Sequence, residues 1–186
     1  MSKGLSIVGS SRKNGEREKY DFYPTPHFVT KELLKREKFL GDIWEPACGK
    51  GDMSEVLIKN GYSVYSSDLI DREYGDGNVD FLNQRQLFSN IITNPPYKYA
   101  LEFVEAAKRQ STNKIAMFLK TVFLESDKRY EMFQDTDFPL ARIYQFSKRI
   151  ALNKNIIDTS KSGMIAYAWF VWDKEHKGKP TIEWIN

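Results

Sequence analysis

The residues best suited to chemistry in this sequence form the stretch Asn94, Pro95, Pro96 and Tyr97. They follow an apolar run, which predicts that they lie at the carboxyl end of a strand, where open α/β sheets bind ligands. The Asn94 side-chain oxygen and the Pro95 carbonyl oxygen, held in place by the fixed proline backbone, are suited to accept the two N–H bonds of a planar amino group. Such acceptors stabilise the positive charge that develops on the nitrogen as it attacks an electrophilic methyl group. Tyr97 offers a flat face for stacking, although a simple proline-rich turn would explain the same four residues.

A turn typical of nucleotide-binding proteins follows the first predicted strand. The strand ends on Glu45, Pro46 and Ala47, and Gly49 and Gly51 come next. Both glycines would let the backbone approach a ligand closely, although a tight turn without a ligand is the alternative. The third glycine of the dinucleotide fingerprint Gly-x-Gly-x-x-Gly is absent, because position 54 is a serine. A cofactor with a pyrophosphate is therefore disfavoured.

Two acidic positions further along the chain favour a cofactor that contains adenosine. Asp68 ends the second predicted strand, where a carboxylate commonly accepts hydrogen bonds from both ribose hydroxyls. Asp80 is expected at a further strand end, where it could accept from an adenine amino group while the ring of Phe81 packs on the base. A cofactor with ribose and adenine but no phosphate fits this set, and S-adenosylmethionine is such a molecule.

Apolar periodicity predicts an alternation of helices and strands that positions these residues. The expected helices are a segment from Phe28 to near Lys38, Met53–Lys59, Leu101–Lys108 and Val122–Phe133. The expected strands begin at Ile43, cover Tyr62–Ser67, precede Asn94, and cover Lys114–Leu119, Ala141–Phe146 and Met164–Trp172. This order indicates an α/β fold with a doubly wound, mostly parallel sheet and one antiparallel strand near an edge.

Composition indicates a soluble, intracellular protein. The 186 residues are 41% hydrophobic and 14% aromatic, which is ample for a core. We expect residues 20–186 to form a single domain and the polar, basic residues 1–19 to form a flexible arm. The net charge of +3 neither indicates nor opposes a nucleic-acid partner. One cysteine, two distant histidines, and the lack of a long apolar run or signal-peptide core predict no disulfide, no metal site, no membrane span and a cytoplasmic location.

The motifs occur along the chain in the order Tyr23-Pro24-Thr25-Pro26, Glu45 to Gly51, Asp68-Leu69, Asp80-Phe81 and Asn94 to Tyr97. With this ordered set, over roughly residues 20–185, the chain resembles class I S-adenosylmethionine-dependent methyltransferases. The likeness is greatest to the DNA adenine N6-methyltransferases of phages and prophages. The resemblance implies a Rossmann-like, seven-stranded, mostly parallel sheet whose last strand is antiparallel.

The resemblance also implies a role for each motif. The segment from Tyr23 to Pro26 would cap the methionine end of the cofactor, and the glycine turn would pass beneath it. The Asp68-Leu69 pair would hold the ribose, and the Asp80-Phe81 pair would hold the adenine. The Asn94 to Tyr97 stretch would receive an adenine that has been flipped out of DNA.

A basic loop over residues 147–163 is the one sizeable insertion. Its cations are Lys148, Arg149, Lys154 and Lys161, against a single acid, Asp158. They could contact nucleic-acid phosphates, or the loop could simply be solvated. Larger relatives carry a separate target-recognition domain after the last strands, which we do not expect here. Because phosphate contacts position a nucleic acid without specifying its sequence, we expect weak or short sequence specificity.

Other targets and another kind of function remain open. Asn-Pro-Pro-Tyr also occurs in enzymes that methylate glutamine side chains of release factors or guanine N2 of ribosomal RNA. Protein glutamine N5, RNA guanine N2 and RNA adenine N6 are therefore alternative targets, and a non-catalytic S-adenosylmethionine-binding regulator is a further alternative. Cys48 has no histidine near it in the sequence, and we interpret it as a buried residue that packs under the glycine turn rather than as a nucleophile.

Overall fold

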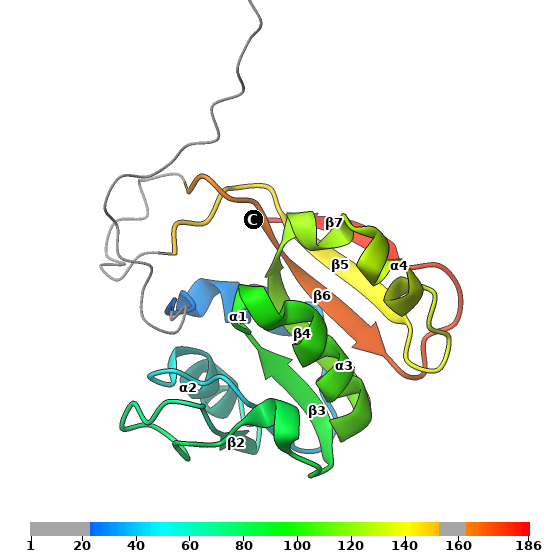
Figure 1. Ribbon diagram of the computed structural model, residues 1–186. Coiled ribbons are helices and arrows are strands. Elements are labelled where there is room, and N and C mark those ends of the chain that lie inside the picture. The colour runs from blue at the N-terminus through cyan, green and yellow to red at the C-terminus, as the bar shows by residue number, and fades with distance from the viewer. Residues whose placement is uncertain (1–22, 153–162) are drawn as a thin grey trace, which may run out of the picture.

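The structure, a computed structural model, describes residues 23–152 and 163–186 (Figure 1). The expected basic arm, residues 1–19, and two of the loop cations, Lys154 and Lys161, lie outside the described residues. The helices are α1 (His27–Leu34), α2 (Asp52–Lys59), α3 (Ala100–Gln110) and α4 (Asp127–Phe133), with short 3-10 helices η1 (Phe81–Asn83), η2 (Tyr97–Tyr99) and η3 (Thr121–Leu124). The strands are β1 (Ile43–Glu45), β2 (Val64–Ser66), β3 (Phe88–Thr93), β4 (Ser111–Lys120), β5 (Leu140–Phe146), β6 (Tyr167–Asp173) and β7 (Thr181–Ile185).

The seven strands of the described residues form one sheet in the order β2-β1-β3-β4-β6-β5-β7. Strands β1, β2, β3 and β4 run parallel to one another, so their carboxyl ends lie at the same edge of the sheet. Strand β6 lies between β4 and β5 and is antiparallel to both. The expected fold class, an α/β protein with a seven-stranded, mostly parallel, doubly wound sheet, is confirmed.

The place of the antiparallel strand in the chain differs from the expectation. The antiparallel strand is β6, and the last strand is β7, which pairs parallel with β5 from Arg142↔Thr181 to Phe146↔Ile185. The sequence did not reveal β7 because it is short and its first four residues are exposed. Its apolar side chains therefore do not form the buried run that marks the other strands.

The helix expected at Val122–Phe133 is divided into two. The first part is η3, which ends at Leu124. Ser126 then adopts a φ of 136° and its side chain accepts a hydrogen bond from the backbone N–H of Lys128, which caps α4. Serine favours this position because its oxygen satisfies a free N–H of the first helical turn.

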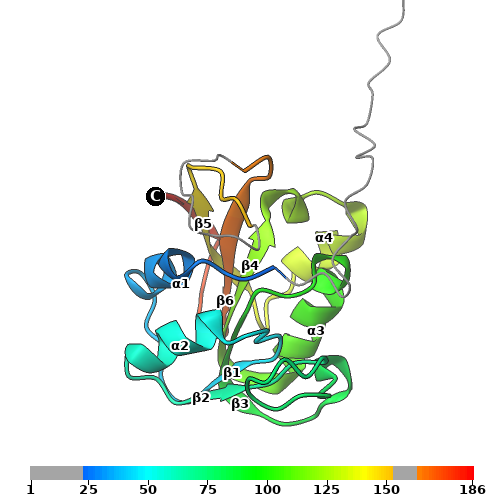
Figure 2. The ribbon, with the colours of Figure 1, turned by 90° about the vertical axis from the view of Figure 1, so that its left-hand side faces the viewer.

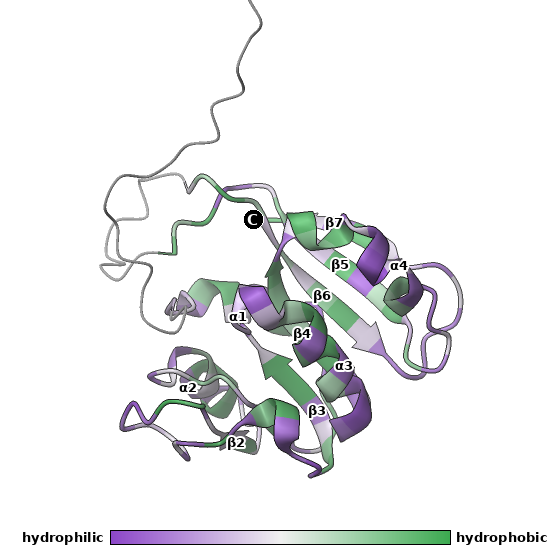
Figure 3. Cartoon of the chain, in the orientation of Figure 1, coloured by the Kyte–Doolittle hydropathy of each residue, from purple (hydrophilic) through white to green (hydrophobic). Residues whose placement is uncertain are grey.

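Helices cover both faces of the sheet, with α1 and α2 on one side and α3 and α4 on the other (Figure 2). Because side chains alternate along a strand, β6 buries Trp169 and Val171 with the first pair of helices, and Phe170 and Trp172 with the second. The Trp169 Nε1 donates to the Val29 carbonyl at 2.9 Å, which joins α1 to the sheet. Apolar segments accordingly follow the central strands, and polar segments lie on the outward parts of the helices (Figure 3).

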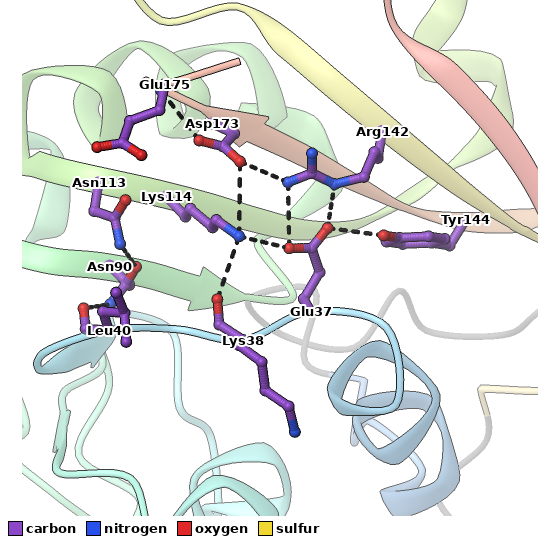
Figure 4. A network of polar contacts seen from close by, with 10 residues as sticks. All are labelled: Glu37, Lys38, Leu40, Asn90, Asn113, Lys114, Arg142, Tyr144, Asp173 and Glu175. Carbon is purple, nitrogen blue, oxygen red and sulfur yellow. Dashed lines mark hydrogen bonds and ion pairs between the residues drawn. The ribbon is translucent and has the colours of Figure 1, made fainter.

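A buried ionic network lies at the amino end of β4 (Figure 4). Glu37, which is 2% exposed, accepts hydrogen bonds from Lys114 (2.8 Å), Tyr144 (2.8 Å) and Arg142. Arg142 also donates to Asp173 at 2.7 Å. We call these five residues the Glu37 network. It joins the chain after α1 to β4, β5 and β6, and its charges tolerate burial because each one is paired.

Candidate functional site

A cavity of about 1020 Å³ lies at the carboxyl ends of the parallel strands. Its wall includes Glu45 from the end of β1, Asp68 from beyond β2, Asn94 from beyond β3 and Lys120 from the end of β4. The segment before α1, residues 23–25, lines the cavity as well. Pockets for one small molecule commonly measure roughly 300–1,000 Å³, so this cavity is large enough for two groups side by side.

Most residues that the sequence singled out meet in this cavity. They are Tyr23, Pro24, Thr25, Glu45, Pro46, Ala47, Asp68, Leu69, Asp80, Phe81, Asn94, Pro95, Pro96 and Tyr97. Pro26, Gly49 and Gly51 do not line it. The Pro26 carbonyl accepts the Val29 N–H at the start of α1 (2.9 Å), and Gly51 precedes α2 with a φ of 90°. A Cβ at position 51 would lie 2.3 Å from the Tyr74 ring, so the turn itself requires glycine there.

Asn94 has a defined orientation in the cavity wall. Its Nδ2 donates to the Tyr23 carbonyl oxygen (3.3 Å) and to Thr25 Oγ1 (3.0 Å). A carbonyl can only accept a hydrogen bond, so the amide nitrogen must lie on this side. Within the described residues, Oδ1 of Asn94 receives no hydrogen bond. It is an acceptor that remains available to a ligand with an N–H group.

Of the two proline carbonyls that follow Asn94, one accepts a hydrogen bond from a described residue and the other does not. The Pro96 carbonyl accepts the Tyr99 N–H at 2.9 Å, as the chain turns into η2. The Pro95 carbonyl accepts no hydrogen bond from any described residue. Asn94 Oδ1 and the Pro95 carbonyl are thus two acceptors that no described residue uses, and they are the pair that the sequence predicted for an amino group.

Tyr97 has a more crowded environment than the expected open stacking face. Its ring stacks with Tyr23, with centroids 6.4 Å and planes 23° apart, and packs against Tyr167 at 5.8 Å. The Lys120 ammonium lies over the same ring, 4.6 Å from the centroid. Burial raises the pKa of the Tyr97 phenol well above its ordinary value. Its buried hydroxyl makes no hydrogen bond with any described residue. The face that Lys120 covers becomes available to a planar ligand only when the lysine side chain moves.

Asp68 joins the two motifs that the sequence assigned to a cofactor. Its Oδ2 accepts the backbone N–H of Gly49 (2.8 Å), and its Oδ1 accepts that of Ile70 (2.9 Å). An ionised carboxylate offers about four acceptor sites, so both oxygens can still accept from a ligand hydroxyl. The contact also gives Gly49 a function within the turn, because its N–H fixes the position of the carboxylate.

Asp80 does not follow a strand, contrary to the expectation. It precedes η1 and caps it, accepting hydrogen bonds from the Leu82 N–H (3.1 Å) and from Asn83 Nδ2 (2.6 Å). Asn, Asp and Ser favour such positions because their side chains bond the backbone locally, a preference that sequence spacing does not distinguish from a ligand contact. Phe81 is 2% exposed and packs on Trp44, with ring centroids 5.0 Å apart.

Glu45 is a buried carboxyl group in the cavity wall. Burial raises its pKa to about 8, against a hydrogen bond from Ser54 that lowers it. The group is therefore mostly protonated at neutral pH. No described residue forms an ion pair with it. A cationic ligand in the cavity would supply the missing partner and favour the ionised form.

Cys48 is also buried in this wall, and burial raises the pKa of its thiol to about 12. The thiolate, which is the nucleophilic form, is therefore absent at neutral pH. This agrees with the interpretation of Cys48 as a packing residue beneath the glycine turn.

Sequence reasoning missed several charged residues of the cavity wall, among them the lysines Lys98 and Lys120. Neither one forms an ion pair with any described residue. Lys98 lies 5.1 Å from the centroid of the Tyr99 ring. Lys120 could have been found, because it directly follows a predicted strand and so belongs to the ligand-binding edge of the sheet.

The described residues of the predicted basic loop, 147–152 and 163, do not line the cavity. Lys148 is exposed, and Arg149 Nη1 donates to the Met164 carbonyl at 2.8 Å, which connects the two ends of the loop. In residues 23–152 and 163–186, no three His, Cys, Asp or Glu side chains gather in an arrangement that could hold a metal ion. The helices of these two ranges include none with the length and apolarity that crossing a membrane requires.

No protein-family model matches this sequence, and none of the curated proteins matches it either. Solved structures do match. A Vibrio vulnificus protein described as the modification subunit of a type I restriction enzyme has a TM-score of 0.60 and 16% identity over 89% of this chain, which spans only 47% of that protein. A Pyrococcus horikoshii protein described as an RNA methyltransferase has a TM-score of 0.64 and 15% identity, with 83% of this chain and 88% of that one covered.

A third match is a Listeria monocytogenes protein described as a class I S-adenosylmethionine-dependent methyltransferase. It has a TM-score of 0.60 and 11% identity, and the alignment covers 86% of this chain and 62% of that one. At these identities the likeness is one of fold. The chain has the Rossmann-like fold of the class I methyltransferases.

Proposed function

We propose that this protein is an S-adenosylmethionine-dependent N-methyltransferase whose preferred target is the N6 amino group of adenine in DNA. The observation that carries the proposal is the orientation of Asn94. Its amide nitrogen is held by Tyr23 and Thr25, so Oδ1 and the neighbouring Pro95 carbonyl remain as unused acceptors in a cavity at the ligand-binding edge of the sheet. Two acceptors on neighbouring residues suit an amino group with two N–H bonds.

The wall formed by β1 and β2 fits S-adenosylmethionine. Glu45 is a buried carboxyl without a cationic partner among the described residues, which suits a positively charged ligand. Asp68 retains acceptor sites for ribose hydroxyls, and Leu69 presents apolar surface, being 55% exposed. The bound cofactor would supply an electrophilic methyl group. The residues Glu45, Asp68 and Leu69 would hold and orient it beside Asn94.

The wall around Asn94 would hold the target base. As the amino nitrogen attacks, positive charge develops on it, and the Asn94 and Pro95 oxygens stabilise that charge without reorganising. Adenine in a duplex must leave the base stack first, which costs a few kcal/mol. Contact with the Tyr97 ring would recover roughly 1–3 kcal/mol of this cost. For this contact the Lys120 side chain leaves the ring face that it covers.

A nucleic-acid target is supported by the unpaired cations of the cavity rim. Lys98 and Lys120 both lie beside the tyrosines of η2, and no described carboxylate neutralises them. Lysines placed in this way suit the phosphates that flank a flipped nucleotide. The Vibrio vulnificus neighbour, described as a restriction modification subunit, supports DNA. The Pyrococcus horikoshii neighbour, described as an RNA methyltransferase, supports an RNA amino group as the second candidate.

The proposal is tested by transfer of a labelled methyl group to unmethylated double-stranded DNA, single-stranded DNA and RNA, with the product nucleosides identified by mass spectrometry. We expect N6-methyladenine in DNA. Methylated guanine or adenine in RNA would favour the second candidate. Transfer to none of the three, with S-adenosylmethionine binding established by calorimetry, would contradict the proposal and favour a protein glutamine or a non-catalytic regulator.

The calorimetric titration has its own matched variant. Asp68→Ala is expected to weaken S-adenosylmethionine binding by roughly 10- to 100-fold, the loss of charge-assisted hydrogen bonds to ribose. Unchanged affinity would remove Asp68 from the cofactor site. Because Asp68 also holds the Gly49 turn, circular dichroism of the variant is the control for folding.

A further inference from the structure

The side-chain amide of Asn94 can adopt two orientations of nearly the same shape. In one, Oδ1 faces the cavity and accepts an N–H bond. In the other, Nδ2 faces the cavity and would repel an amino group. The proposed chemistry needs the first orientation, so other residues must hold the amide in it and exclude the second.

The segment before α1 supplies two hydrogen-bond partners for this purpose: the Tyr23 carbonyl, which can only accept and so selects the orientation, and the Thr25 hydroxyl, which holds Nδ2 in place beside it. The Tyr23 carbonyl lies 3.3 Å from Asn94 Nδ2, and Thr25 Oγ1 lies 3.0 Å from it. In the flipped orientation, Oδ1 would face the Tyr23 carbonyl, which has no proton to donate. The amide nitrogen has two N–H bonds, and these two oxygens are partners for both of them. Thr25 is 5% exposed, so water does not readily replace its hydroxyl.

The sequence of the segment explains why both acceptors hold their positions. Tyr23 and Thr25 each precede a proline, and a residue before proline is restricted to extended backbone conformations. Pro24 and Pro26 fix their own φ angles as well. The end of the segment is anchored in turn, because Pro26 begins α1 and the Val29 carbonyl of α1 accepts the Trp169 indole N–H at 2.9 Å.

We propose that Tyr23-Pro24-Thr25-Pro26 is an orienting clamp for Asn94 and that Thr25 is a positioning residue of the transfer reaction. The clamp fixes Asn94 Oδ1 as an acceptor, which restricts the target to a group that donates N–H bonds. This inference rests on the proposed function and goes beyond it. The expected role of the segment was contact with the cofactor, whereas the clamp acts on the target side through Asn94.

The first test compares two variants of the same position in the full chain. Thr25→Val keeps the shape of the side chain and removes the hydroxyl, whereas Thr25→Ser keeps the hydroxyl. At S-adenosylmethionine concentrations shown by calorimetry to saturate each variant, we expect Thr25→Val to lower kcat roughly 10- to 100-fold, with little change in KM for DNA. Thr25→Ser should restore most of that loss. Equal kcat in Thr25→Val and the parent protein, or equal losses in both variants, would overturn the proposal.

A second test does not depend on activity. In protein labelled with ¹⁵N at asparagine, the Asn94 side-chain amide signals are assigned by their loss in Asn94→Asp, and their hydrogen exchange is measured without substrate. We expect slow exchange in the parent protein and in Thr25→Ser, and faster exchange of the amide in Thr25→Val. The same fast exchange in all three would overturn the clamp even in an active enzyme. The expected pattern in a protein that methylates none of the three nucleic acids would support the clamp and contradict the proposed function.

Discussion

Glu37 and Glu45 are equally buried, at 2% exposed each, yet they lie in opposite kinds of surroundings. Glu37 is bonded to Lys114, Arg142 and Tyr144 at the amino end of β4 (Figure 4). Glu45 has a hydrogen bond from Ser54 and no ion-pair partner among the described residues. The first carboxylate is held by cations of the chain itself, and the second is left for a ligand.

The same difference extends to the regions around these two residues. In the Glu37 network the charges meet one another, and the hydrogen bond from Arg142 holds the pKa of Asp173 below its ordinary value although burial alone would raise it. In the cavity, Asn94 Oδ1, the Pro95 carbonyl and the Tyr97 hydroxyl have no hydrogen bonds from described residues. Buried polar groups that are fully paired stabilise a fold, whereas unpaired ones at a cavity wall indicate ligand contacts.

The largest expected effect tests the structural side of this comparison. Glu37→Ala leaves Asp173 as the one carboxylate of the network for both Lys114 and Arg142, and removing one partner of a buried ion pair costs about 3–5 kcal/mol. We expect urea denaturation to show a loss of this size in the free energy of unfolding, while methyl transfer per folded molecule is retained. Tyr144→Phe, which removes one hydrogen bond to Glu37, should cost only about 1 kcal/mol. A stable Glu37→Ala protein with reduced transfer would contradict the assignment of the network to stability.

Asn94→Ala tests the cavity side of the comparison. Removing one preorganised group that stabilises transition-state charge typically lowers kcat by about 10²–10³-fold. We expect a loss of at least this size in labelled methyl transfer, with S-adenosylmethionine affinity within a few fold of the parent protein and an unchanged urea midpoint. A variant that keeps most of its rate would remove Asn94 from the mechanism. Asn94→Asp is the matched variant. Its carboxylate has nearly the shape of the amide but no N–H bond to donate to the Tyr23 carbonyl, so the contact that orients residue 94 is lost.

The sequence predicted those parts of the molecule that local patterns encode. The apolar runs before Asn94 and from Lys114 onward marked β3 and β4, and the rule that ligands bind at the carboxyl ends of parallel strands then brought most of the cavity residues together. The sequence predicted Asp80 at the end of a strand, whereas it caps η1. The prediction was wrong because a local cap and a ligand contact use the same residue type.

The Glu37 network could not be predicted, because its members come from four places distant in sequence that only the register of β4, β5 and β6 brings together. The contact between Lys120 and Tyr97 depends in the same way on β3 and β4 lying side by side, with Thr93 paired to Met117. Local sequence patterns identify which residues can do chemistry. The partners of those residues follow from strand order, which a single sequence specifies only through the whole fold.

Glu45→Gln sharpens the contrast between the two glutamates. Burial raises the pKa of Glu45 from 4.5 to about 8, so between these pH values the folded protein holds a proton that the unfolded chain has released. The free energy of unfolding should therefore fall as pH rises through this range, by up to about 1.4 kcal/mol per pH unit. Glutamine keeps an acceptor for Ser54 and does not ionise, so the variant should gain stability relative to the parent between pH 5 and pH 8. Parallel urea midpoints across this range would contradict a protonated Glu45.

Lys120→Met has the smallest expected effect and addresses what the unpaired cations of the cavity are for. If the ammonium that lies over Tyr97 contacts a phosphate when the base enters, its removal should raise KM for DNA a few fold. It should also reduce the slope of log affinity against log salt by about one. Lys177→Met, in the exposed turn between β6 and β7, is the matched control and should change neither quantity. Because Lys120 also covers a ring face that the base would use, its loss removes an obstacle as well as a contact, so kcat at saturating DNA should be kept or rise. A fall in kcat with an unchanged salt slope would instead assign Lys120 to the folded structure of the cavity, on the same side of the comparison as Glu37.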